Sequence, residues 1–149
     1  VFFGYIANRA VRNMPPLGFL KTFVVEKSGE YKDKLNLKTK GIAPIVDMIR
    51  LFALEKQVNE TSTLERIEVL KDKHQIVAEY AEELVHSLEF LMMLRMRNQF
   101  EQIKQRSPVD NFIDPETLTN LEKKTIKEAF NVISKVQDLL IERYKPMIL

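Results

Sequence analysis

The stretch 43–54 constrains the fold more than any other part of the chain, because apolar side chains surround almost its whole helical circumference. Asp47 and Arg50 are its only charged residues. The apolar ones are Ala43, Ile45, Val46, Met48, Ile49, Leu51, Phe52, Ala53 and Leu54. Such a helix is stable only when other helices cover it on several sides. The stretch therefore predicts a central helix buried within a bundle.

Two helices are predicted after this one from their end signals. Ser62 and Glu65 have the spacing of a capping box, which predicts a helix from there to about Lys73. A long helix follows from about Val77 to Arg106 and ends before Ser107-Pro108, since the residue before proline avoids the α region. Its apolar residues are Leu84, Leu88, Leu91, Met92, Met96, Phe100 and Ile103.

The two ends of the chain are also predicted to be helical. Asp114 can cap a helix that has Pro115 at its first position and that ends at Pro146. One apolar stripe follows that helix at helical spacing, formed by Ala129, Ile133, Val136, Leu140 and Tyr144. A short helix over 3–13, stopped by Met14-Pro15-Pro16, completes the set.

One region predicts β structure. Residues 19–25 and 31–37 can form a hairpin around a Ser28-Gly29 turn, and the lysine excess over 21–40 suits either a solvated edge or a surface that faces phosphate. The expected fold is therefore all-α, an antiparallel helical bundle of about five helices with a small β-hairpin near the N-terminus.

Composition excludes several functional classes. The chain has 149 residues, no Cys and a formal net charge of +2, which predicts one soluble domain over 1–149 without a disulfide framework or a Cys-bound metal. We expect a cytoplasmic location, no membrane span and no nucleic-acid partner, since acids match the bases nearly everywhere. His74 and His86 lack metal-ligand spacing and are expected to be partly exposed. The start at Val1-Phe2 lacks Met and a basic leader, so we expect a piece of a longer multidomain protein.

Arg95 admits two interpretations. It lies within Leu91–Arg97, where a permanently charged guanidinium needs a partner or a large desolvation cost follows. It can form a buried ion pair, most plausibly with Asp47 on the central helix. Alternatively, Arg95, Asn98 and Gln99 share a helix face and can present donors to an anionic ligand or partner in a cleft.

The order of several short motifs resembles a known family. The motifs are Pro15-Pro16-Leu17-Gly18-Phe19, Leu35-Asn36-Leu37-Lys38 with Gly41, Pro44-Ile45-Val46-Asp47, Thr63-Leu64-Glu65-Arg66, Leu94-Arg95-Met96-Arg97-Asn98-Gln99, and Asp110-Asn111 with Asp114-Pro115. Together they resemble the putative nucleotidyltransferase substrate-binding domain. Members of that family usually have Asp where this chain has Asn36, and often His where it has Asn98.

The resemblance implies an accessory domain beside a separate nucleotidyltransferase domain similar to that of protein-PII uridylyltransferases. Nucleotidyl transfer of this type needs a Gly-Ser turn and an Asp-x-Asp pair for magnesium, and this chain has neither. We therefore expect no catalytic residue, metal or cofactor here, with Mg²⁺ confined to the adjoining domain. The residues expected to bind a nucleotide or an acceptor protein are Lys38, Lys40, Asp47, Arg50, Arg95, Asn98, Gln99 and Asn111.

A rival interpretation uses the same bundle differently. In this interpretation the chain is a non-catalytic interaction or dimerisation module in a bacterial signalling protein. It would relay signals from cyclic-nucleotide-binding or CBS domains, and a homodimer is one form that it can take.

Overall fold

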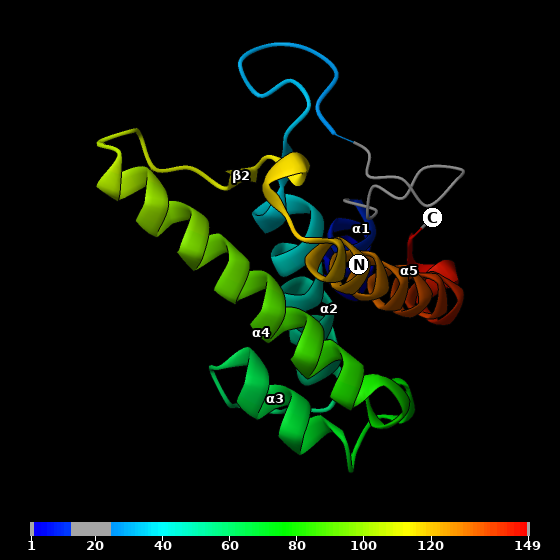
Figure 1. Cartoon of the computed structure of the whole chain (residues 1–149). Coiled ribbons are helices and arrows are strands. Elements are labelled where there is room, and N and C mark those ends of the chain that lie inside the picture. Colours follow the sequence, from blue (N-terminus) through cyan, green and yellow to red (C-terminus); the bar gives the residue numbers. More distant parts are fainter. Residues whose placement is uncertain (1, 13–24, 149) are drawn as a thin grey trace.

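The computed structural model describes residues 2–12 and 25–148, the side chains of 145–148 excepted (Figure 1). Its long elements in these residues are five α-helices, which confirms the all-α class. The helices are α1 (Phe2–Arg12), α2 (Ala43–Glu55), α3 (Thr63–Leu70), α4 (Gln75–Lys104) and α5 (Asn120–Ile148). Helix α5 continues past Pro146, so the prediction that it ends there is wrong.

Helix α2 is the centre of the core, as its apolar circumference predicts. Ile45, Met48 and Phe52 are completely buried, and α1, α3 and α5 all pack against the helix. Helix α5 contributes its predicted stripe, whose five residues are all buried. Helices α1 and α5 lie side by side next to α2, whereas α3 packs beneath the first half of α4 (Figure 1). One continuous hydrophobic core therefore joins the two ends of the chain.

The β structure is not the hairpin that the sequence predicted. Residues 19–24 lie outside the described residues, and the chain does reverse at Gly29, whose φ of +83° favours glycine. The strand that follows, β1 (Leu35–Asn36), pairs antiparallel with β2 (Phe112–Ile113) from a distant part of the sequence. Leu35 and Ile113 are buried opposite each other, so burial of this apolar pair decides the pairing rather than proximity along the chain.

A π-helical turn, η1 (Lys38–Ile42), leads directly into α2. Asn36 stabilises its start, since the side-chain Oδ1 accepts a hydrogen bond from the Thr39 amide at 3.0 Å. Gly41 is buried where η1 meets α4, and a Cβ at this position would lie 2.7 Å from Cδ1 of Leu91. A larger residue here would therefore force the buried Leu91 side chain to shift.

Helix ends match the sequence signals only in part. Ser62 is the N-cap of α3, but its side chain makes no capping hydrogen bond, and the helix ends at Leu70, earlier than predicted. Asp114 does cap a helix, accepting from the Glu116 amide at 2.9 Å, but this is the short η2 (Pro115–Thr117). The reciprocal capping box lies at the start of α5, between Thr119 and Glu122.

Helix α4 is longer than the core that it covers. Its first half packs on α3 and α5, and its C-terminal half projects away from α2 and α5 towards β2 (Figure 1). The apolar residues of this half split into two sets, because Leu91 and Leu94 are buried whereas Met92, Met96, Phe100 and Ile103 are exposed. No helix among the described residues has both the length and the apolar character needed to cross a bilayer.

Candidate functional site

Polar side chains on the C-terminal half of α4 hold the segment 110–112 in place. Nε of Arg95 donates to Oδ1 of Asn111 at 2.6 Å, and Nδ2 of Asn98 donates to the Phe112 carbonyl at 2.7 Å. Nε2 of Gln99 donates to the Asp110 carbonyl at 3.0 Å. We call these hydrogen bonds between α4 and 110–112 the clamp. Since Phe112 belongs to β2, the clamp fixes the strand that pairs with β1.

Asp110 completes the clamp from the other side. Its Oδ1 accepts hydrogen bonds from Nε2 of Gln102 at 2.9 Å and from the Phe112 amide at 3.0 Å. Its own amide donates to Oε1 of Gln102 at 3.1 Å. The segment after α4 thus obtains from side chains the partners that a regular strand would obtain from a neighbour.

A cleft of about 660 Å³ lies beside this clamp. Its walls come from the turn 30–34, the flank of α4 between 97 and 105, the connection 107–119 and Glu122 at the start of α5. Tyr31 and Phe112 stack face to face in its lining, with ring centroids 3.8 Å apart and planes inclined by 7°. The stack joins the turn to β2. Both rings are half-buried, so their exposed parts form an apolar patch in a polar cleft.

The charges in the cleft are mainly negative. Five carboxylates line it against two cations, namely Glu30, Glu101, Asp110, Asp114 and Glu122 against Lys34 and Arg97. Arg97 is paired, with Nη1 2.5 Å from Oε1 of Glu122. This bond, with the Thr119 amide, holds the pKa of the Glu122 carboxyl below its usual range. The cleft therefore favours hydrogen-bond donors and positive charge over anions.

Four of the eight predicted site residues come together in this region. Arg95, Asn98, Gln99 and Asn111 form the clamp, and of these only Asn98 also lines the cleft. Arg95, Asn98 and Gln99 each use one donor group within the protein, and Asn111 accepts through Oδ1, so the first role of these residues is to shape the site. Arg97, which is not among the predicted site residues, is the arginine that lines the cleft.

Asp47 and Arg50 lie elsewhere, on α2. The expected pair between Arg95 and Asp47 is wrong: Oδ2 of Asp47 lies 3.5 Å from Nε of Arg9, and its Oδ1 lies 3.5 Å from Nη1 of Arg50. Asp47 faces α1 because α2 is surrounded by different helices on its different sides, which a helical pattern alone does not assign. The Arg9–Asp47 pair joins α1 to α2 at the surface, whereas the Arg50–Asp47 pair lies within α2.

Lys38 and Lys40 are in η1 and do not line the cleft. Lys38 is exposed and Lys40 is half-buried. Of the basic residues between 25 and 40, Lys34 is the one in the cleft lining.

Comparison with family models found one match, to the family described as "Putative nucleotidyltransferase substrate binding domain", over residues 1–144. The chain belongs to this family. Comparisons with curated proteins and with solved structures found no match. The family match covers every described element of the chain except the last residues of α5, and it includes both the clamp and the cleft.

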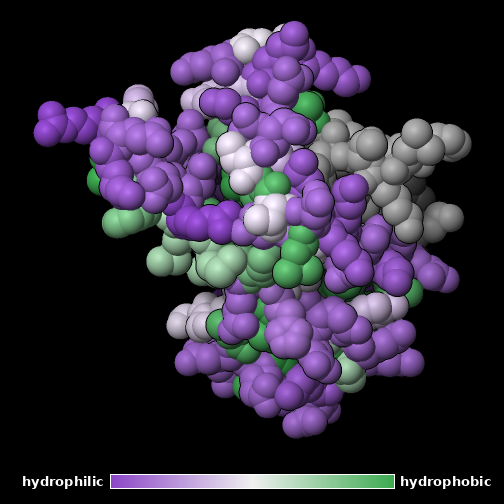
Figure 2. Space-filling view, in the orientation of Figure 1, coloured by the Kyte–Doolittle hydropathy of each residue, from purple (hydrophilic) through white to green (hydrophobic). Residues whose placement is uncertain are grey.

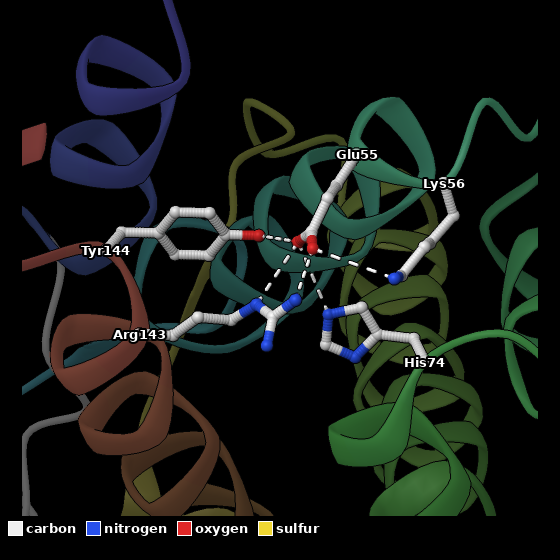
Figure 3. Close-up of polar contacts among 5 residues, drawn as sticks. All are labelled: Glu55, Lys56, His74, Arg143 and Tyr144. Atoms are coloured by element: carbon white, nitrogen blue, oxygen red, sulfur yellow. Dashed lines mark hydrogen bonds and ion pairs between the residues drawn. The ribbon is translucent and has the colours of Figure 1, made fainter.

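The chain has a second polar cluster, which the sequence analysis did not predict (Figure 3). Glu55 at the end of α2 accepts hydrogen bonds from Arg143 and Tyr144 of α5. His74, the N-cap of α4, has Nε2 3.5 Å from Oε2 of Glu55, and its ring lies 4.3 Å from that of Phe52. Lys56 approaches the same carboxylate at 3.8 Å. The cluster joins three helices at the end of the molecule away from the cleft.

Burial and charge oppose each other in this cluster. Burial raises the pKa of Glu55, but hydrogen bonds from Arg143 and Tyr144 and the Arg143 charge outweigh it and lower that pKa to about 2. Burial lowers the pKa of His74 below its ordinary value and exceeds the opposite effect of Glu55. Burial and the Glu55 carboxylate together raise the pKa of the Tyr144 phenol. The ionised carboxylate is therefore the stable form at neutral pH.

The sequence contained one signal for this cluster. Tyr144 closes an apolar stripe with a side chain whose hydroxyl needs a partner when buried. His74 is only 3% exposed, so the expectation that both histidines are partly exposed is wrong for this one, while His86 is exposed. Among the described residues, no three acidic, histidine or cysteine side chains gather to hold a metal ion.

Proposed function

We propose that this chain is the accessory domain of a nucleotidyltransferase and holds the acceptor of the nucleotidyl group, while an adjoining domain of the same protein holds the nucleotide and Mg²⁺. In this proposal the whole protein is a bacterial, cytoplasmic signalling enzyme similar to protein-PII uridylyltransferases. The family match supports the link to a nucleotidyltransferase and to substrate binding.

The charge of the cleft is the observation that carries the choice of acceptor over nucleotide. With the Arg97–Glu122 pair set aside, a triphosphate placed there would lie against four carboxylates and one cation, Lys34. Like charges at this range oppose binding. An acceptor that brings hydrogen-bond donors or a lysine or arginine side chain gains instead from the same groups.

The clamp also supports this proposal, because it fixes the geometry of one wall of the cleft. Accurate transfer requires an acceptor held in one geometry beside the reacting phosphate. The cleft wall formed by 110–112 is fixed by hydrogen bonds from three consecutive turns of α4, so it is prepared before any ligand arrives.

The rival function, an interaction module that relays signals from upstream sensor domains, has one observation in its favour. Apolar side chains are exposed along the C-terminal half of α4, where a partner surface can cover them. The two functions are compatible, because this surface and the cleft lie on different flanks of the helix.

Isothermal titration calorimetry of the chain tests the choice between acceptor and nucleotide. The two probes are a short oligolysine peptide and Mg²⁺-loaded UTP. We expect the peptide to bind and UTP to give no heat, and Glu101→Lys to weaken peptide binding at least about tenfold. Glu79→Lys is the matched control, an exposed carboxylate of α4 that does not line the cleft. Binding of UTP, or equal losses in both variants, would contradict the proposal.

A further inference from the structure

Five apolar side chains on the C-terminal half of α4 form an exposed surface, here named the α4 stripe. They are Met92 (42% exposed), Met93 (48%), Met96 (65%), Phe100 (59%) and Ile103 (60%). Figure 2 shows pale green atoms gathered in a band over this half of α4, with purple hydrophilic atoms along its border. Soluble monomers rarely expose a contiguous apolar surface of this kind, and where one occurs it usually marks an interaction site.

The stripe cannot be covered by folding back onto the domain's own core. Helical residues advance by about 100° each, which places Phe100 opposite Leu91 and Asn98. Leu91 is buried in the core and Asn98 holds β2, so both inner faces of α4 are already occupied. The stripe therefore faces outward as a consequence of the clamp.

The spacing of the stripe fits another helix of the same kind. Met93, Met96, Phe100 and Ile103 follow the alternating three- and four-residue steps of a coiled-coil seam. The pattern is also symmetric about its middle. When two copies of α4 run antiparallel, Met93 meets Ile103 of the second copy, and Met96 meets Phe100. A two-fold axis makes each of these two contacts twice, as an isologous dimer requires.

Charges along the same helix face favour the antiparallel direction. Glu89 continues the seam one step before Met93, so a parallel pair would place the two copies of Glu89 against each other. The antiparallel pair separates them and brings each Glu89 to the end of the second helix, where Lys104 lies. The Lys104 side chain is flexible and 58% exposed, and its ion pair at this end of the helix is with Glu101. Arg97, on the adjacent flank, is held by Glu122 and does not oppose the pairing.

The area is sufficient for a dimer of modest affinity. Five side chains of this size, each about half exposed, leave roughly 500 Å² of apolar surface per copy. Two copies bury about 1,000 Å², which is the lower limit for a specific interface. We propose that the α4 stripe is a homodimer interface, in which the C-terminal halves of α4 from two copies of this chain pack antiparallel around Phe100 and Met96.

Sedimentation velocity across a concentration series tests for the dimer. We expect a reversible monomer–dimer equilibrium, and we expect Phe100→Glu to weaken dimerisation at least about tenfold because two carboxylates then enter the apolar seam. The matched control is Leu121→Glu, since Leu121 is 73% exposed on α5 outside the stripe. Circular dichroism of each variant checks that the monomer stays folded. A chain that remains monomeric up to millimolar concentration, or a dimer that Phe100→Glu leaves unchanged, would overturn the proposal.

Disulfide trapping tests the direction of the pairing. The chain has no cysteine, so single Met96→Cys and Phe100→Cys variants introduce one thiol each without competing partners. An equimolar mixture of the two, oxidised under mild conditions, should give mainly the mixed cross-linked dimer. Each variant alone should cross-link several-fold more slowly. Faster cross-linking of either variant with itself would show a parallel pair and overturn the antiparallel arrangement.

Discussion

Arg95 shows how one charged residue on an apolar helix is accommodated. The guanidinium is half-buried and donates to the neutral Asn111 side chain at 2.6 Å, so the protein satisfies it with an amide oxygen rather than a carboxylate. A neutral partner avoids the cost of desolvating two opposite charges. Asn98 acts similarly, because its Nδ2 donates to a neutral partner, the Phe112 carbonyl.

Replacing Arg95 by Met should lower the free energy of unfolding by about 1–2 kcal/mol, because one charge-assisted hydrogen bond is lost but no buried charge is left alone. Urea melts measure the loss. In a double-mutant cycle with Asn111→Ala, most of this loss should disappear. Losses that simply add would show that the Arg95–Asn111 bond does not stabilise the fold.

The Glu55 cluster should make the stability of the domain depend on pH. The pKa of His74 is lowered in the folded protein, so below about pH 6.5 the unfolded chain takes up a proton first and stability falls. The pKa of Glu55 is lowered from 4.5 to about 2, so a second loss follows as the pH falls from about 4.5 towards 2. This second loss is no more than about 3 kcal/mol.

Urea melts between pH 7 and 5 separate the histidine from the carboxylate. His74→Gln should flatten the dependence of the unfolding free energy on pH in this window, and His86→Gln, at an exposed position of α4, should leave it unchanged. An identical slope in all three proteins would contradict a role for His74.

At the scale of elements, periodic patterns predicted most of the helices and missed the long-range β pairing. The apolar circumference of α2 and the stripe of α5 are strong signals because burial on a helix repeats regularly, and both are confirmed. Residues 35–36 of the predicted hairpin instead pair with β2, because a two-residue strand can pair with any other short strand that buries its partner, while residues 19–24 of that hairpin lie outside the described residues. The residues of the clamp were predicted in part, as donors on α4 and as Asn111. The pattern does not show that Asn111 and the carbonyls of 110 and 112 accept hydrogen bonds from those donors.

Gly41 tests the contact between η1 and α4. Gly41→Ala should lower the free energy of unfolding by about 1–3 kcal/mol, because the new methyl group would lie 2.7 Å from Cδ1 of the fully buried Leu91. Thermal and urea melts measure the change. If the cause is this clash, the cost should shrink when Leu91 is already alanine. An equal cost in both backgrounds would point to a different origin.

At the scale of the whole molecule, α4 organises the functional surfaces. One flank carries the clamp and the cleft, and the outer face carries the α4 stripe. The Glu55 cluster ties α2, α4 and α5 together at the opposite end, so the long helix has a fixed base and a projecting working half. A dimer through the α4 stripe would leave both clefts accessible, because no residue of the stripe lines the cleft.

The central claim is that the acidic cleft, and not another surface, takes an acceptor with positive charge. Its most direct test is an amide ¹H–¹⁵N NMR titration of the chain with the oligolysine peptide and, separately, with Mg²⁺-loaded UTP. We expect the peptide to shift the amides of 30–34, 97–105 and 107–119, which line the cleft, and UTP to shift none of them. Shifts of the same amides by UTP, or peptide shifts centred on α1 and α2, would contradict the account.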